Sequence, residues 1–260
     1  MALTYSSYLK IDELLSLQRQ VSDGPEHDEM LFIVIHQVYE LWFKQFLHEI
    51  DFLKRLLETG DVPRALHTMK RILTILKVAV AQIDILETMT PLEFLSFRER
   101  LESGSGFQSF QFRELEFLLG MKRPAALDRY PVGSDHRARL ERRLAEPTLW
   151  DSFLRLLAHH GHAVPDEALS RDVTRPIESV PALHPVLIRI YRSDPMASVL
   201  CERMVDLDEG LQEWRYRHVK MVQRTIGTKK GTGGSDGAAY LMTTLNHALF
   251  PDLWAIRTEL

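Results

Sequence analysis

Apolar residues recur every three to four positions along most of the chain, which is the spacing of an amphipathic helix. The longest stretch of this kind spans residues 28–58, and a turn at residues 59–63 ends it. No alternating strand pattern and no internal repeat is found, so the expected fold is all-α. We predict one domain, residues 1–260, of long antiparallel helices. The further helices are expected at residues 65–88, 91–101, 110–119, 134–160, 195–223 and 238–250, with loops and turns over 161–185.

Local residues mark some helix ends. Thr90 followed by Pro91 is typical of a helix N-cap with proline in the first turn. Gly120 follows the helix expected at residues 110–119 and is a common C-terminal residue. Four arginines between residues 137 and 143 lie among acidic residues, which predicts a solvated helix face.

The composition excludes several classes of protein. Among 260 residues, 32 are Lys or Arg and 36 are Asp or Glu, so the net charge of −4 gives no basic footprint for nucleic acid. Cys201 is the single cysteine, which excludes an intramolecular disulfide, a cysteine-rich zinc site and an iron–sulfur cluster. The 11 histidines make imidazole, with carboxylates, the expected ligand of any transition metal. Because we find neither a secretory signal nor a membrane-spanning run, we expect a cytoplasmic protein.

Two histidines lie on apolar helix stripes. His36 is surrounded by apolar neighbours in the first long helix, and His218 interrupts the apolar stripe of the helix at residues 195–223. A single histidine in such a place is usually a core residue whose two nitrogens are hydrogen-bonded. Two of them on separate long helices raise the alternative of a haem site, which needs one axial imidazole and a polar group on the distal side.

Other residues suggest chemistry less specifically. Arg98 beside aromatic residues can bind a carboxylate with its guanidinium, although pairing with Glu102 one turn away is the simpler interpretation. The glycine-rich loop at residues 227–237 is either a linker or a mobile lid, in which Thr232 and backbone N–H groups can bind an anion. The histidines at residues 159–162 fit a helix end better than a metal site.

Several ordered motifs make the sequence resemble the tryptophan 2,3-dioxygenase family over nearly its whole length. They are Thr4-Tyr5-Ser6-Ser7-Tyr8-Leu9, the run from His27 to Gln37, Glu40-Leu41-Trp42, Phe97-Arg98, Ser105-Gly106-Phe107-Gln108-Ser109, Trp214-Arg215-Tyr216-Arg217-His218, and residues 226–234. The resemblance implies an all-α haem enzyme, typically a homotetramer. Its members insert both atoms of O2 across the indole C2–C3 bond of L-tryptophan, and so form N-formyl-L-kynurenine in tryptophan catabolism.

The resemblance also assigns roles to residues of this chain. His218 would be the proximal ligand of haem b, ferrous in the active state, and His36 the distal catalytic histidine hydrogen-bonded to the indole N–H. Arg98 and Thr232 would bind the substrate carboxylate. Around them, Phe32 and Phe94 would line the indole pocket, Ser105, Gly106 and Trp214 would border the haem, and Tyr5, Tyr8 and Leu9, in the segment at residues 1–20, would close a neighbouring subunit's pocket.

One departure leaves the substrate open. Some bacterial relatives carry tyrosine where this chain has Phe94, and the missing hydroxyl would remove a donor to the carboxylate. The alternatives are therefore a relative that oxygenates a substituted tryptophan, a haem- or tryptophan-binding sensor without turnover, and a helical interaction module without a cofactor. The near-neutral charge fits a zwitterionic substrate held by one local arginine.

Overall fold

A computed structural model describes residues 2–24, 26–102, 104, 106–229, 231 and 238–260. In these ranges the chain forms α-helices and short 3₁₀ helices and no β-strand, which confirms the all-α prediction. No helix in the same ranges is long and apolar enough to cross a membrane.

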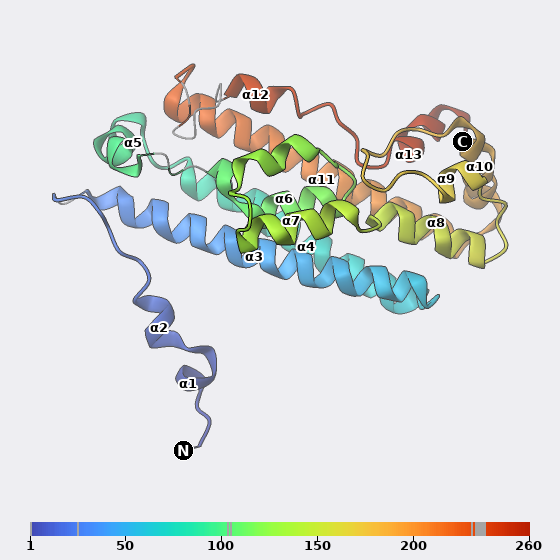
Figure 1. The fold of residues 1–260 in the computed structure, drawn as a ribbon, viewed down its shortest axis with the longest axis horizontal. Coiled ribbons are helices and arrows are strands. Elements are labelled where there is room, and N and C mark those ends of the chain that lie inside the picture. The colour runs from blue at the N-terminus through green and yellow to red at the C-terminus, as the bar shows by residue number, and fades with distance from the viewer. Residues whose placement is uncertain (1, 25, 103, 105, 230, 232–237) are drawn as a thin grey trace.

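Three long helices form the body: α3 (His27–Glu58), α4 (Val62–Leu86) and α11 (Pro195–Ile226) (Figure 1). Helices α3 and α4 make an antiparallel hairpin, because the chain reverses at Gly60, whose φ of 75° favours glycine. Helix α11 packs against α4 in the same direction: Leu76 lies beside Gly210, and seven residues later Arg217 contacts Asp84.

Shorter helices cover both ends and one side of this body (Figure 1). Helices α5 and α12 lie at one end, α8, α9, α10 and α13 lie at the other, and α6 and α7 lie between them. Their bounds are α5 Pro91–Arg98, α6 Phe110–Leu118, α7 Asp135–Ala145, α8 Leu149–His159, α9 Asp166–Leu169, α10 His184–Ser193, α12 Ala238–Met242 and α13 Pro251–Ala255. The 3₁₀ helices are Glu99–Leu101, Gly106–Gln108, Pro124–Arg129, Pro181–Leu183 and Ile256–Glu259.

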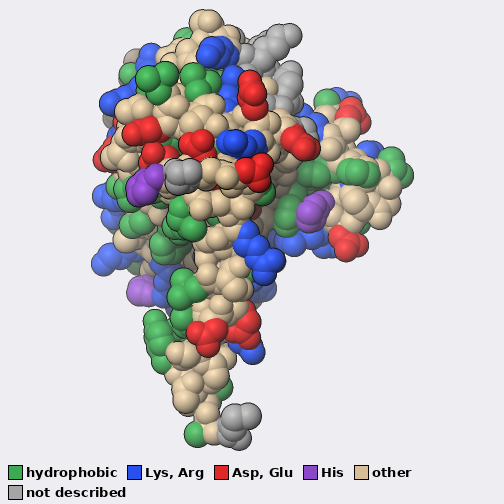
Figure 2. All heavy atoms as spheres, turned by 90° about the vertical axis from the view of Figure 1, so that its left-hand side faces the viewer, with side chains coloured by type: hydrophobic (Ala, Val, Ile, Leu, Met, Phe, Trp, Pro, Cys, Tyr) green, Lys and Arg blue, Asp and Glu red, His purple; other side chains and the backbone are tan. Residues whose placement is uncertain are grey.

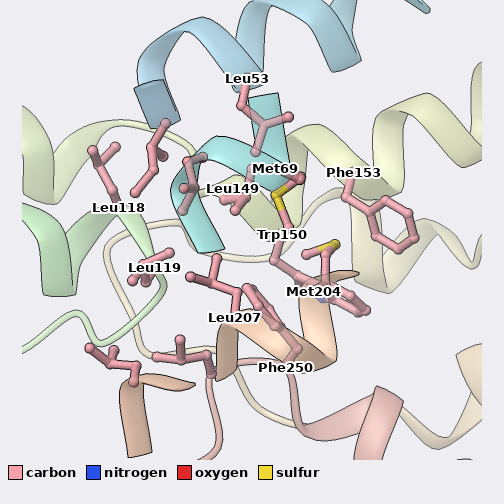
Figure 3. Close-up of a cluster of buried hydrophobic side chains, with 14 of the residues drawn as sticks. Leu53, Met69, Leu118, Leu119, Leu149, Trp150, Phe153, Met204, Leu207 and Phe250 are labelled. Carbon is pink, nitrogen blue, oxygen red and sulfur yellow. The ribbon is translucent and has the colours of Figure 1, made fainter. Parts of the chain in front are cut away.

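A cluster of large buried apolar side chains lies where α3, α4, α8 and α11 meet the C-terminal segment (Figure 3). Trp150 is 2 % exposed and contacts the rings of Phe153 and Phe250 at centroid distances of 5.3 and 5.6 Å. Burying large aromatic side chains stabilises the fold by roughly 2–3 kcal/mol each. This core fixes α11 relative to α3 and α4, and therefore positions the histidines farther along these helices.

The prediction of one helix over residues 134–160 is wrong, because the chain forms α7 and α8 instead. Pro147 lacks the N–H that a continuous helix needs, and Thr148 starts α8 as an N-cap. The Thr148 hydroxyl accepts from Asp151 N, while the Asp151 carboxylate accepts from Thr148 N, which is a capping box. A local cap therefore overrides the apolar periodicity that continues across the break.

The helix predicted at residues 238–250 is also too long. Helix α12 ends at Met242, and α13 begins only at Pro251. Near this gap the backbone N–H groups of Leu249 and Phe250 donate to the buried carboxylate of Asp208 at 2.8 and 3.1 Å instead of to helical carbonyls. Helix α10, by contrast, was not predicted from the sequence at all.

The arginine-rich helix α7 is only partly the solvated face that its sequence predicts, since Arg142 is exposed and Arg143 is not. Arg139 and Arg143 both contact Glu114, a buried carboxylate on α6. Arg143 also binds Asp51 of α3 through two hydrogen bonds of 2.8 and 2.6 Å. The charges on α7 therefore hold it against α6 and α3.

The N-terminal segment projects away from the body (Figures 1 and 2). It contains α1 (Tyr5–Leu9) and α2 (Ile11–Leu15), and none of the residues in these helices is buried. The chain rejoins the body just before α3, where Val21 N donates to the carboxylate of Glu29 at 2.7 Å. We call residues 2–16 the N-terminal arm. Its apolar side chains are exposed, and they include Leu3, Tyr5, Tyr8, Leu9 and Leu15.

Candidate active site

His36 on α3 and His218 on α11 line the same internal space. Two adjoining hollows of about 950 and 880 Å³, which include space open to solvent, lie at the end of the body near α5 and α12. Both hollows are lined by His36, Leu86, Gly106, His218, Met221 and Leu241. The two histidines on apolar stripes are therefore not ordinary core residues, since both face one cavity.

The hydrogen bond of His36 defines its protonation. Its Nδ1 lies 2.7 Å from the backbone oxygen of Phe32, one turn earlier, so Nδ1 carries the proton and donates it. Burial lowers the pKa of His36 below 6.5, although Phe32 and Glu40 act in the opposite direction. The imidazole is therefore neutral at neutral pH, and its Nε2 is a hydrogen-bond acceptor.

His218 is neutral for a related reason. Burial, and to a smaller degree the neighbouring His36, lower the pKa of His218 from 6.5 to about 4. Its ring stacks on Trp214, with centroids 5.2 Å apart and planes within 10°. It forms no hydrogen bond with any residue that the structure describes. A neutral imidazole held by stacking keeps its lone pair available to a metal ion.

Three phenylalanines form an aromatic cluster beside His36. Phe32 lies 5.8 Å from Phe94 and 5.6 Å from Phe97 between ring centroids, and its ring is 4.0 Å from that of His36. Phe32 and Phe94 line the 880 Å³ hollow together with Arg98. An apolar surface with one guanidinium at its edge fits a ligand that has a flat apolar part and a carboxylate.

The 950 Å³ hollow has a cationic region, which sequence reasoning missed. Glu116, 3 % exposed, binds Arg123 through two hydrogen bonds of 2.9 Å and is also paired with Arg113, while Arg215 lies 3.8 Å away. Burial lowers the pKa of Arg215 even though Glu116 opposes this shift. Three arginines thus surround one buried carboxylate at this side of the hollow.

A second carboxylate faces the same hollow from α3. Glu40 lies one turn after His36 and accepts a hydrogen bond of 2.8 Å from the side chain of Gln111. The charged residues that line this hollow are thus three arginines and two glutamates, one positive charge in excess. Arg215 lies three residues before His218, and residues three apart lie on the same face of a helix. This spacing was the sequence signal that could have indicated the cationic region.

Tyr39 on α3 contacts both α4 and Trp214 of α11. Its side chain is 9 % exposed, and its hydroxyl donates to the backbone oxygen of Ala79 on α4 at 2.7 Å. Burial raises the pKa of Tyr39 to about 12, so the hydroxyl remains protonated. The ring contacts Trp214 edge-on at 6.2 Å, which places Tyr39 behind the ring that stacks on His218.

The structure brings together most of the residues proposed for the site. Around the two hollows it gathers Phe32, His36, Phe94, Arg98, Gly106, Trp214 and His218. Ser105 and Thr232 lie outside the described residues, as does most of the loop at residues 227–237. Tyr5, Tyr8 and Leu9 lie on the N-terminal arm and are not among the residues that line these hollows.

The remaining histidines have other surroundings. His162 pairs with Asp194, the N-cap of α11, at 3.0 Å, and His184 pairs with the buried Asp252 at 3.0 Å. Among the residues described, no group of three or more histidine, cysteine or acidic side chains is arranged to hold a metal ion.

The family model for tryptophan 2,3-dioxygenase matches residues 1–132 and 177–260. The chain belongs to the tryptophan 2,3-dioxygenase family. All residues that line the two hollows lie within the matched ranges, whereas α7, α8 and α9 lie between them.

Individual tryptophan 2,3-dioxygenases are similar over their full length. The chain is 63 % identical to the enzyme of Herpetosiphon aurantiacus, with 100 % of this chain and 99 % of the relative covered. It is 57 % identical to that of an Anaeromyxobacter species, covering 100 % and 97 %. A Bacillus thuringiensis enzyme is 40 % identical, covering 99 % and 93 %.

Proposed function

We propose that the protein is a haem-dependent tryptophan 2,3-dioxygenase. It inserts both atoms of O2 across the indole C2–C3 bond of L-tryptophan and produces N-formyl-L-kynurenine. The observation that carries this proposal is the pair of neutral imidazoles, His36 and His218, that face one cavity in a chain of this family.

The residues present fit haem b. His218 would be the proximal ligand, since its imidazole is neutral and has no competing hydrogen bond among the described residues. Trp214 stacks on this imidazole and fixes its plane, and Gly106, which lines both hollows, would border the haem. Ser105, which lies outside the described residues, would border it too. The arginines that line the 950 Å³ hollow would suit the carboxylates of the haem propionates. When bound, ferrous haem supplies the site at which O2 binds and is activated.

His36 orients the substrate indole. Because Nδ1 donates to Phe32 O, Nε2 accepts a hydrogen bond from the indole N–H. The indole N–H is a very weak acid, so this role is orientation and not removal of a proton. Phe32 and Phe94 hold the plane of the substrate's indole ring at the same time. Correct placement of the reacting atoms and exclusion of water are the main contributions of the protein.

Arg98 fixes the other end of the substrate. Its guanidinium binds the carboxylate of L-tryptophan in the two-pronged geometry that arginine favours. Thr232 lies outside the described residues, and in this proposal it would add a second donor to the same carboxylate.

The protein acts as a cytoplasmic homotetramer in this proposal. The exposed apolar residues Tyr5, Tyr8 and Leu9 of the N-terminal arm close the pocket of a neighbouring subunit. Exposed apolar surface of this kind favours association with another chain. The single domain thus comprises residues 1–260, with the segment at 1–20 reaching a neighbour and a lid at 227–237.

The test is turnover by the purified, haem-loaded and reduced protein. Mixed with L-tryptophan in air-saturated buffer, it should consume one O2 for each N-formyl-L-kynurenine formed, measured by oxygen electrode and product chromatography. Oxygenation of a substituted tryptophan alone would identify the substrate as that analogue. Tryptophan binding without any product would identify a sensor, and failure to take up haem would contradict the proposal.

A further inference from the structure

A buried apolar cavity lies where α3, α4, α6 and α11 converge, and we call it the inner cavity. It has a volume of about 360 Å³, counted up to the surrounding atoms, and we define it by Phe43, Phe46, Phe112, Leu115, Leu207 and Trp214. Phe43, Phe112 and Trp214 also line the 950 Å³ hollow. Leu207, by contrast, belongs to the buried cluster of Figure 3. The inner cavity therefore lies between the candidate active site and this core.

The surface of the inner cavity is apolar throughout. Phenylalanine, leucine, isoleucine, alanine and tryptophan side chains line it, and no polar atom of the residues that the structure describes contributes to its surface. A buried water molecule needs several polar partners, which such a surface does not offer. We therefore expect the cavity to be dry, and dry apolar cavities bind small apolar molecules such as xenon.

Ligands that form hydrogen bonds do not fit this surface. L-Tryptophan carries an ammonium group, a carboxylate and an indole N–H, and each would lose its hydrogen bonds to water without gaining a partner in the cavity, which costs free energy. An apolar diatomic gas has no such group and moves favourably from water into apolar surroundings. O2 is such a gas, and it is the second substrate of the proposed function. The lining therefore favours O2 over L-tryptophan as the occupant.

Three aromatic rings form the wall that the inner cavity shares with the 950 Å³ hollow. Phe43 lies 5.3 Å from Phe112, and Trp214 lies 5.1 Å from Phe112 and 6.3 Å from Phe43, measured between ring centroids. Trp214 also stacks on His218, so this aromatic wall lies directly beside the proposed iron ligand. Side chains change their rotamers transiently even in close-packed interiors, and a small displacement of one ring admits a diatomic molecule.

We propose that the inner cavity binds O2 and exchanges it with the 950 Å³ hollow across this aromatic wall. The role rests on the proposed function, in which O2 and L-tryptophan react in the adjoining hollows. O2 that leaves the hollow before it reacts is held behind Trp214 and returns from there, instead of being lost to solvent. Because Leu115 and Leu207 line the cavity and neither hollow, larger side chains at these positions test the cavity by itself.

Xenon tests whether the inner cavity binds an apolar gas. Crystals of the haem-loaded protein kept under xenon pressure should contain a xenon atom between Phe46, Leu115 and Leu207. Leu115→Phe fills the cavity from α6 and should abolish this xenon site, and Leu207→Phe does so from α11 if the first variant does not fold. Leu73→Phe is the matched control and should keep the xenon, because Leu73 on α4 borders a groove open to solvent and not the cavity. No xenon in the unmodified protein, an ordered water in its place, or xenon retained in the filled variants would overturn the proposal.

CO tests the exchange across the aromatic wall, because light releases this diatomic gas from ferrous haem. Released CO that enters the inner cavity should return in a second, slower phase whose rate does not depend on the CO concentration. We expect this phase to be lost in Leu115→Phe and under xenon pressure, and to persist in Leu73→Phe. Its absence from the unmodified protein, or its survival in the filled variant and under xenon, would contradict the proposal. The haem Soret band and product formation from L-tryptophan, recorded on the same samples, test the proposed function separately.

Discussion

The two ends of the helical body use their buried residues differently. At the end formed by α8, α10 and α13, large side chains such as Trp150 and Phe250 fill the space between the helices. Buried charges there have partners: Arg171 binds Asp151 through hydrogen bonds of 2.7 and 2.8 Å, and Asp208 accepts from Trp254. We call this the packed end.

At the other end the same long helices leave space between them. His36 and His218 face two hollows, and three arginines outnumber the two glutamates that line one of them. Desolvation keeps both imidazoles neutral. The contrast teaches that packing at one end fixes the helices, while incomplete packing and charge compensation at the other end leave room for a bound group.

Removal of the His218 imidazole should have the largest effect. His218→Ala takes away the proposed axial ligand, so the reconstituted protein should lose the haem Soret band and all measurable dioxygenase activity. The matched control is His162→Ala, since His162 pairs with Asp194 outside the cavity and should leave haem binding unchanged. A normal Soret band in His218→Ala would contradict the assignment.

Truncation of Trp150 at the packed end should lower the free energy of unfolding. Trp150→Ala removes a side chain that is 2 % exposed and leaves a cavity, so the free energy of unfolding should fall by about 3–5 kcal/mol. Urea unfolding of the haem-free protein measures this loss. The KM for L-tryptophan of the folded fraction should remain unchanged, and a large rise in KM would mean that the two ends are not independent.

Loss of the Arg98 guanidinium should weaken substrate binding. Arg98→Ala removes the proposed partner of the substrate carboxylate, which should raise the KM by about a hundredfold, equivalent to about 2.7 kcal/mol. Arg98→Lys should recover part of this loss. Arg100→Ala is the control, because Arg100 is exposed and lies 3.7 Å from Glu26. An unchanged KM in Arg98→Ala would exclude this role.

Asp151→Asn should have a smaller effect that depends on pH. Burial raises the pKa of Asp151, but hydrogen bonds from Arg171 and Thr148 outweigh burial and lower it below 3.8. The ionised form therefore stabilises the fold above pH 3.8, and this contribution is lost as the pH falls through the lower folded-state pKa. We expect Asp151→Asn to lower the free energy of unfolding by about 2 kcal/mol at pH 7.

The difference between Asp151→Asn and the unmodified protein should shrink on acidification below pH 3.8. Thermal unfolding measured from pH 7 to pH 3 provides the check. A difference that stays constant over this range would show that the pair with Arg171 does not stabilise the packed end through its charge.

Local and periodic features were predictable from the sequence. The Thr90 cap of α5 depends on neighbours within one turn, and the structure contains it. The apolar stripes that place His36 and His218 were equally visible, because helical periodicity is set by residues three and four apart. The break at Pro147 was missed because the apolar pattern continues on both sides of it.

Contacts between distant segments were not predictable. The cationic region joins Arg113 and Glu116 on α6 with Arg215, about a hundred residues later on α11. No single stretch of sequence contains this arrangement, since it depends on how α11 packs beside α6. The ion pairs of α7 with Glu114 were also missed, because Glu114 lies on another helix, outside the stretch that contains the arginines.

Lys122 lies at the junction between α7 and α8, and its reaction with acylating reagents can report the opening of this junction. Its ammonium group donates to the backbone oxygens of Arg143, Leu144 and Glu146, which the end of α7 leaves without helical partners. Burial, with nearby Lys54, lowers the pKa of Lys122 from 10.5 to about 8, while its side chain is 1 % exposed. Because this shift depends on burial, opening of the junction returns the pKa of Lys122 towards 10.5 and at the same time exposes the amine to reagents that cannot reach it in the closed state. Acylation of Lys122 therefore measures how often this junction opens.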